Sequence, residues 1–133
     1  MQAPEVIKIW HKIVTQKDVG KLGDILAEDV VFHSPVVHTP QEGKAIAQMY
    51  LTAASHVLGG DKFTYVREVY GESDAILEFA TELDGIYLNG VDMIRWNENG
   101  QITDFKVMVR PLKAVNKIHQ LMGAMLDQMK PKK

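Results

Sequence analysis

The sequence contains no cysteine, which excludes disulfide bonds, thiolate nucleophiles and iron–sulfur or zinc-ribbon sites. It also lacks an apolar run near the roughly 18 residues that a membrane-spanning helix needs, and the segment Met1–Lys12 is too charged for a secretory signal. Neither sign of charge is in large excess, because the chain has 15 Lys and Arg residues and 17 Asp and Glu residues. Nucleic-acid binders usually carry a basic excess on one face. We therefore expect a soluble, cytoplasmic protein that binds neither membranes nor nucleic acids.

The regular cofactor and nucleophile motifs are absent as well. There is no phosphate loop, dinucleotide fingerprint, nucleophile-elbow serine or His-Glu-x-x-His zinc motif, so we expect no cofactor. What is present is an ordinary globular composition, with 46% apolar and 24% charged residues over 133 positions. This length and composition predict one domain, spanning 1–133, with a substantial buried core.

Apolar residues at helical spacing predict four helices. The first follows Pro4, where a proline costs no helical hydrogen bond, and carries the stripe between Val6 and Val14. A short second helix is expected over 22–27, a third over 43–58 and a fourth over 112–129.

Between the third and fourth helices the pattern changes to β-branched and aromatic residues separated by turn signals. The dipeptide Asp84-Gly85 is typical of a tight hairpin turn, and such short links give antiparallel pairs. Strands are expected over 30–34, 63–70, 75–83, 86–96 and 102–109. This order predicts an α+β fold in which a strongly curved, antiparallel or mixed sheet wraps around the helices.

Asp92 is the strongest candidate for a functional residue. It lies mid-strand and shares a face with Ile94 and Trp96 by the two-residue period of a strand. Aspartate is rare in strands, and on a buried face its pKa would rise, so that it could donate a hydrogen bond or act as a base near neutral pH. The alternative is an edge-strand carboxylate paired with Arg95 or Arg67.

Histidines supply the candidate partners for Asp92. His33, Ser34 and His38 cluster where the first strand ends, and His11 lies on the first helix. Histidine transfers protons near neutral pH, but ordinary surface hydrogen bonds are the alternative for each of them. We expect no metal site, because no regular geometry supports ligation by His33 and His38 together.

Helix spacing and strand alternation also predict which residues enclose a binding pocket. With the polar Ser34 and Tyr50 added, the expected pocket residues are Trp10, Phe32, Ser34, Tyr50, Phe79, Ile94, Trp96, Phe105, Val107 and Val109. Met93, Lys106 and Met108 should lie on the opposite, outer face of the sheet. An apolar outer face needs a partner, so we expect a homodimer through it.

Several segments together resemble the SnoaL-like branch of the nuclear-transport-factor-2-like superfamily. The resemblance is carried by LAEDVVFHSP at 26–35, Gly43-Lys44, Gly90-Val91-Asp92, NGQI at 99–102 and VRPL at 109–112. It implies a cone-shaped α+β barrel in which a bent sheet and helices enclose one apolar pocket, commonly in a homodimer. The superfamily includes ketosteroid isomerase, polyketide cyclases and limonene epoxide hydrolase, so the fold does not settle the function.

Ketosteroid isomerase gives the most informative comparison of single positions. Asp92 falls where that enzyme keeps a protonated, hydrogen-bond-donating aspartate. Its general base falls at Ser34, which cannot act as a base, and its oxyanion-binding tyrosine falls at about His11. The cyclase-like pattern of one pocket acid and one histidine fits better, with Asp92 and His11 or His38 as catalytic candidates.

The sequence thus predicts a protein that takes a small, apolar, carbonyl-bearing ligand into a pocket. As an enzyme it would be an isomerase or cyclase using cofactor-free acid–base chemistry. The alternative is a non-catalytic module of the same fold that binds a ligand or a protein.

Overall fold

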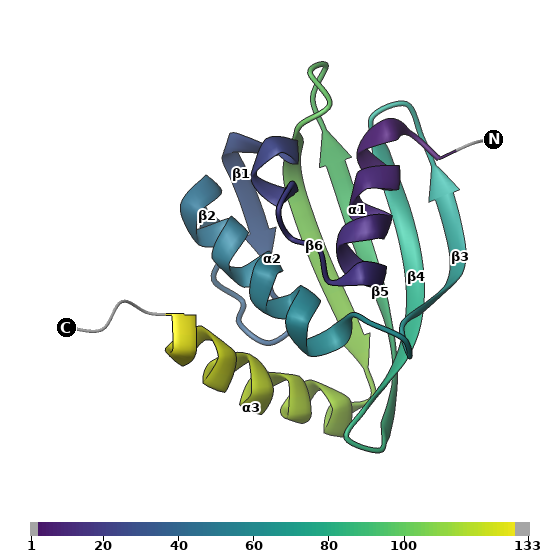
Figure 1. The fold of residues 1–133 in the computed structure, drawn as a ribbon, viewed down its shortest axis with the longest axis vertical. Coiled ribbons are helices and arrows are strands. Elements are labelled where there is room, and N and C mark those ends of the chain that lie inside the picture. The colour runs from purple at the N-terminus through teal and green to yellow at the C-terminus, as the bar shows by residue number, and fades with distance from the viewer. Residues whose placement is uncertain (1–2, 130–133) are drawn as a thin grey trace.

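A bent sheet with helices against one face forms the computed structural model, which describes residues 3–129 (Figure 1). Its helices are α1 (Glu5–Gln16), α2 (Lys44–Leu58) and α3 (Leu112–Met129), with a 3₁₀ turn, η1 (Leu22–Ile25). Its strands are β1 (Leu26–His33), β2 (Gln41–Glu42), β3 (Thr64–Tyr70), β4 (Asp74–Leu83), β5 (Ile86–Trp96) and β6 (Ile102–Arg110). In Figure 1, α1 and α2 lie across the sheet, and α3 runs below α2 across one end of it. None of the helices in residues 3–129 has the length and apolarity to cross a membrane.

The sheet has the order β2-β1-β6-β5-β4-β3, and it is mixed. The neighbouring pairs from β6 to β3 are antiparallel, as the short links predict, whereas β1 pairs with β6 in parallel. The tight turn between β4 and β5 is built by Asp84 and Gly85, whose φ angles of 51° and 81° are both positive. A type I′ hairpin turn requires this conformation at both central positions.

Strand register separates an inner from an outer sheet face. Leu77, Asp92 and Val107 lie directly opposite one another on β4, β5 and β6, and all three are buried. One residue along, Ile76 pairs with Met93, and Ile76 is exposed. The two-residue period of a strand therefore sends Asp92 to the core side and Met93 to the outside, as the sequence predicts.

The apolar residues expected around the pocket are part of the core. The buried members of that set are Trp10, Phe32, Phe79, Ile94, Trp96, Phe105 and Val107. Val109 is half-buried and packs against this cluster.

Two local predictions differ from the structure. The second N-terminal helix shrinks to the 3₁₀ turn η1, and the first strand begins at Leu26 instead of Val30. Leu26 is drawn into the sheet because it pairs with Ile102 of β6, a contact between segments far apart in sequence. The two-residue strand β2 was not anticipated, since a bridge of this length leaves no periodic pattern.

Candidate functional site

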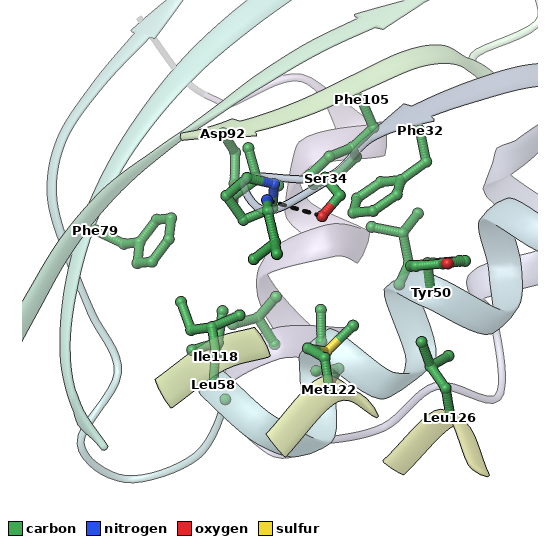
Figure 2. A pocket seen from close by; sticks show the side chains of 18 of the residues that line it. Phe32, Ser34, Tyr50, Leu58, Phe79, Asp92, Phe105, Ile118, Met122 and Leu126 are labelled. Carbon is green, nitrogen blue, oxygen red and sulfur yellow. Dashed lines mark hydrogen bonds between the residues drawn. The ribbon is translucent and has the colours of Figure 1, made fainter. Parts of the chain in front are cut away.

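A cavity of about 210 Å³ lies between the inner sheet face and the helices. Figure 2 shows Asp92 and Phe105 of the sheet on one side of it, with Ile118, Met122 and Leu126 of α3 on the opposite side. The segment that follows β1, from Ser34 to Val37, completes the wall. The helices thus close over the sheet and leave room for a small ligand.

Aromatic rings make up much of the wall. Phe63 and Phe79 stack with their ring centroids 4.9 Å apart and an interplanar angle of 19°. Trp10 meets Phe105 edge-on at 4.8 Å. Aromatic pairs favour such offset or edge-on arrangements, and these rings give the cavity an apolar wall.

Asp92 is the exception in this wall. Its residue is 4% exposed, and burial raises the pKa of its carboxyl to about 8, an effect that the indole N–H of Trp10 opposes weakly. The cations proposed as its alternative partners are engaged elsewhere, since Arg95 lies 3.7 Å from Asp74 and Arg67 donates to Glu78 at 3.1 Å. Asp92 is therefore an uncharged acid at neutral pH, with an O–H to donate.

Two further polar atoms are buried near Asp92. The Trp10 indole N–H lies close enough to the Asp92 carboxyl to oppose the rise in its pKa, but neither this N–H nor the Tyr65 hydroxyl completes a hydrogen bond within residues 3–129. Burial, followed by the Asp92 carboxyl, raises the pKa of Tyr65 well above its ordinary value, so this hydroxyl also stays protonated. Buried donors normally find a partner in protein or water. This end of the cavity can therefore hydrogen-bond an acceptor atom.

Ser34 lines the cavity from the segment after β1. Its Oγ accepts the backbone N–H of Val36 at 3.0 Å and of Val37 at 3.3 Å. A hydroxyl whose acceptor sites are used can still donate its hydrogen. Ser34 thus fixes the shape of this segment and supplies a second, neutral polar contact for a ligand.

The three histidines that the sequence singles out lie outside the lining. His11 follows Trp10 on α1, and a helix turns each residue about 100° from the previous one. Trp10 therefore faces the cavity and Asp92, whereas His11 hydrogen-bonds Glu68 of β3. The resemblance to ketosteroid isomerase places His11 beside Asp92, but Trp10 occupies that position in the structure.

The other two histidines are held at the end of β1. His33 Nε2 lies 3.0 Å from Oδ1 of Asp104 on the adjacent strand β6. His38 is exposed, beyond the lining segment 34–37. The structure does not bring His38 or His33 to Asp92. No group of three or more His, Asp or Glu side chains in residues 3–129 is arranged to hold a metal ion.

Seven of the ten residues predicted to contact a ligand do line the cavity. They are Trp10, Phe32, Ser34, Tyr50, Phe79, Phe105 and Val107. Ile94 and Trp96 share the face of Asp92 but lie two and four residues further along β5, and Val109 lies two residues beyond Val107 on β6. These three do not line the cavity, although Ile94 lies opposite the lining residue Phe105; they belong to the hydrophobic core or pack against it.

The sequence predicted Tyr50 of α2 as a lining residue, but it did not reveal Leu58 of α2 or any lining residue of α3. Leu58 of α2 and Ile118, His119, Met122 and Leu126 of α3 all line the cavity. The 118, 122, 126 spacing marks one face of a helix, but the same spacing also fits core or subunit packing. The direction in which α3 crosses the sheet determines whether this face lines the cavity or packs in the core or against another subunit.

The comparison with known families settles the relationship of this chain. The family model described as SnoaL-like domain matches residues 7–105. The chain belongs to the SnoaL-like family. A search of curated proteins finds no match.

Two solved structures are similar to this chain over most of its length and share nearly a third of its sequence. A steroid delta-isomerase from Pseudomonas aeruginosa is 32% identical, with a TM-score of 0.87 over 93% of this chain and 90% of that one. A protein with a cystatin-like fold from Silicibacter pomeroyi DSS-3 is 31% identical, with a TM-score of 0.83 over 90% of this chain and 84% of that one.

A more distant structure shows the fold alone. An epoxide hydrolase/cyclase-like enzyme of pyran-ring formation in salinomycin is 17% identical, with a TM-score of 0.65 over 80% of this chain and 88% of that one. The SnoaL-like fold thus accompanies isomerase-like and cyclase-like proteins, and the chemistry must be argued from the pocket.

Proposed function

We propose that this SnoaL-like protein binds a small apolar molecule bearing a carbonyl group, and that neutral Asp92 donates a hydrogen bond to the carbonyl oxygen. The observation that carries the proposal is a buried carboxyl, beside which residues 3–129 place no cation, in a cavity walled mainly by aromatic and aliphatic side chains. A neutral acid can donate in such a place, whereas a carboxylate could not.

The chemistry that follows is proton transfer next to the carbonyl. When a C–H bond beside a carbonyl breaks, its electron pair moves to the oxygen, and a hydrogen bond that strengthens with that charge lowers the barrier. Return of the proton to another carbon gives isomerisation, and attack of the enolate carbon on an electrophile gives cyclisation. Asp92 stabilises the oxygen in both, which is consistent with the isomerase and cyclase-like proteins that share the fold.

The candidate base in this scheme is His119 of α3. It is the one histidine among the lining residues of the described chain. A neutral imidazole nitrogen would take the proton from carbon and return it to the product. Ser34, which falls at the position of the base in ketosteroid isomerase, does not have the basicity for this role.

A non-catalytic ligand carrier is the second candidate. It is favoured by the exposure of His119, which lies at the solvent end of the lining while Asp92 lies at the buried end. A ligand too short to contact both groups would be bound and polarised without losing a proton.

Deuterium exchange of 2-tetralone, a two-ring apolar ketone, tests the proposal. The protein in D₂O is expected to speed exchange of the protons beside the carbonyl, followed by NMR, and ketone binding is followed by quenching of tryptophan fluorescence. Asp92→Asn keeps the shape and one donor but donates more weakly, so exchange should fall about tenfold or more while binding persists. His119→Ala should also remove exchange and spare binding.

The matched control is Asp29→Asn, which changes an exposed aspartate outside the cavity. Binding without exchange in the unmutated protein would favour the carrier. Exchange that is unaltered by Asp92→Asn would contradict the role given to Asp92.

A further inference from the structure

The place where the cavity reaches solvent can be located from the exposure of its lining. Of the lining residues, Val37, His119 and Gly123 are exposed, and the others are buried or half-buried. Val37 belongs to the segment after β1, and the other two belong to α3. The mouth therefore lies at the edge of α3, opposite the segment from Ser34 to Val37.

Gly123 is unusual for its position. It lies inside the 18-residue helix α3, where glycine is less favourable than alanine. A Cβ at this position would meet no atom within 4 Å, so close packing does not account for the glycine. Its conformation does not account for it either, because it lies in regular helix.

The neighbours of Gly123 show where a side chain would go. Met122 and Leu126 line the cavity from the half-buried side of the helix, and His119, one turn before Gly123, lines its exposed edge. Residues three and four apart share a helix face, so a side chain at 123 would stand beside His119 at the mouth.

The opposite edge of the mouth is held in place. The Ser34 hydroxyl accepts the N–H groups of both Val36 and Val37, which fixes the turn that carries Val37. A bulky side chain at 123 would therefore project into an opening whose opposite edge is held in place.

We propose that Gly123 is a specificity-determining residue of this pocket, because its missing side chain forms the opening through which the ligand enters. The identity of the ligand in this inference rests on the proposed function. The existence of the opening does not depend on it. It predicts that residue size at position 123 controls the rate of entry and the bulk of the ligand admitted.

Quenching of Trp10 fluorescence by acrylamide tests the opening without any assumed ligand. The sequence holds two tryptophans. Trp96→Phe leaves Trp10, which lines the cavity and is 4% exposed, as the single reporter. In this background Gly123→Leu is expected to lower the quenching constant several-fold, and Gly123→Ala to lower it less.

Ala124→Leu is the matched control, since Ala124 is exposed, adjacent in α3 and outside the lining. It should leave quenching unchanged. Circular dichroism checks that each variant retains its helices. Equal quenching in Gly123→Leu and Ala124→Leu, with both variants folded, would overturn the inference.

Binding kinetics of 2-tetralone then separate this inference from the proposed function. Gly123→Leu should slow association and dissociation together by about tenfold, with little change in affinity, because it narrows the route and leaves the binding contacts intact. If the ketone does not bind to the unmutated protein while Gly123→Leu still protects Trp10, the proposed ligand is wrong and the opening stands. If the ketone binds and leaves both variants at the original rates, the opening is elsewhere.

Discussion

Asp92 has an ionisable carboxyl buried among apolar side chains, and this burial makes the stability of the fold depend on pH. The folded protein holds the proton up to a pKa of about 8, whereas an unfolded chain releases it near 3.8. Between these values the unfolded state binds fewer protons than the folded state. The free energy of unfolding must therefore fall as the pH rises through this range.

The Asp92→Asn variant stays neutral at every pH and should lose this dependence. We expect the unfolding free energy of the variant, minus that of the unmutated protein, to increase between pH 5 and pH 7.5. The increase should reach up to about 1.4 kcal/mol per pH unit. Urea unfolding across this range measures the difference. Glu78 and Glu82 do not disturb it, because hydrogen bonds lower their pKa values below 4.5 and their contributions are lost only at more acid pH. Parallel pH profiles for the two proteins would contradict the account.

Gly90 sets the position of an aromatic ring in the pocket wall. A Cβ at Gly90 would lie 2.4 Å from Cζ of Phe79, which stacks on Phe63 and lines the cavity. Gly90→Ala must push this ring aside and should cost about 1–3 kcal/mol of unfolding free energy. Adding Phe79→Leu to this variant should recover part of the loss, as a double-mutant cycle in urea would show. Additive effects of the two changes would mean that the ring does not set the cost.

At the scale of single residues, the sequence allowed the burial of Asp92 to be predicted but not the identity of its neighbours. Strand parity is local, so the inner face of β5 could be predicted from alternation alone. Whether Trp10 or His11 faces Asp92 depends on the rotation of α1 about its axis, which is set by packing against the sheet. The participation of His119 depends on where α3 crosses the sheet, and no local pattern encodes that.

The contact between α1 and β3 carries its own prediction. His11 hydrogen-bonds Glu68, and its ring lies 4.8 Å from that of Tyr65. His11→Ala should cost about 0.5–1.5 kcal/mol of unfolding free energy through the lost hydrogen bond. Deuterium exchange of 2-tetralone should be unaffected, in contrast to His119→Ala. If His11→Ala lost deuterium exchange of 2-tetralone while its stability was unchanged, His11 would have a role in the chemistry of the site.

At the scale of elements, the well-predicted segments are those with local signals. Helix α3 spans the predicted residues 112–129, and the β4–β5 hairpin turns at Asp84-Gly85. Strand β1 was predicted to begin four residues too late, because its first residue joins the sheet through a parallel pair with distant β6. Local periodicity carries no information about such a pairing.

The outer sheet face bears on the assembly of the whole molecule. Val69, Ile76 and Met108 are exposed on strands β3, β4 and β6, although large apolar side chains usually avoid such exposure in groups. We expect this face to be covered by a second copy of the chain. Sedimentation at micromolar concentration should show a dimer, and charged substitutions at Ile76 and Met108 should give a monomer.

Leu112→Lys is the control for this prediction, because Leu112 is exposed at the start of α3 and not on the sheet. It should leave the dimer intact. A monomer for the unmutated protein at these concentrations would exclude the outer-face dimer.

Titration of the Asp92 carboxyl carbon by NMR tests the central claim, that this SnoaL-like pocket keeps a neutral acid at its buried end. Comparison of spectra from the unmutated protein and Asp92→Asn assigns the resonance. A buried, neutral Asp92 is expected to titrate with a midpoint near the pKa of about 8 that burial produces. A midpoint at or below the ordinary value of 3.8 for this carboxyl would mean a charged carboxylate, and the hydrogen bond proposed for the carbonyl could not be donated.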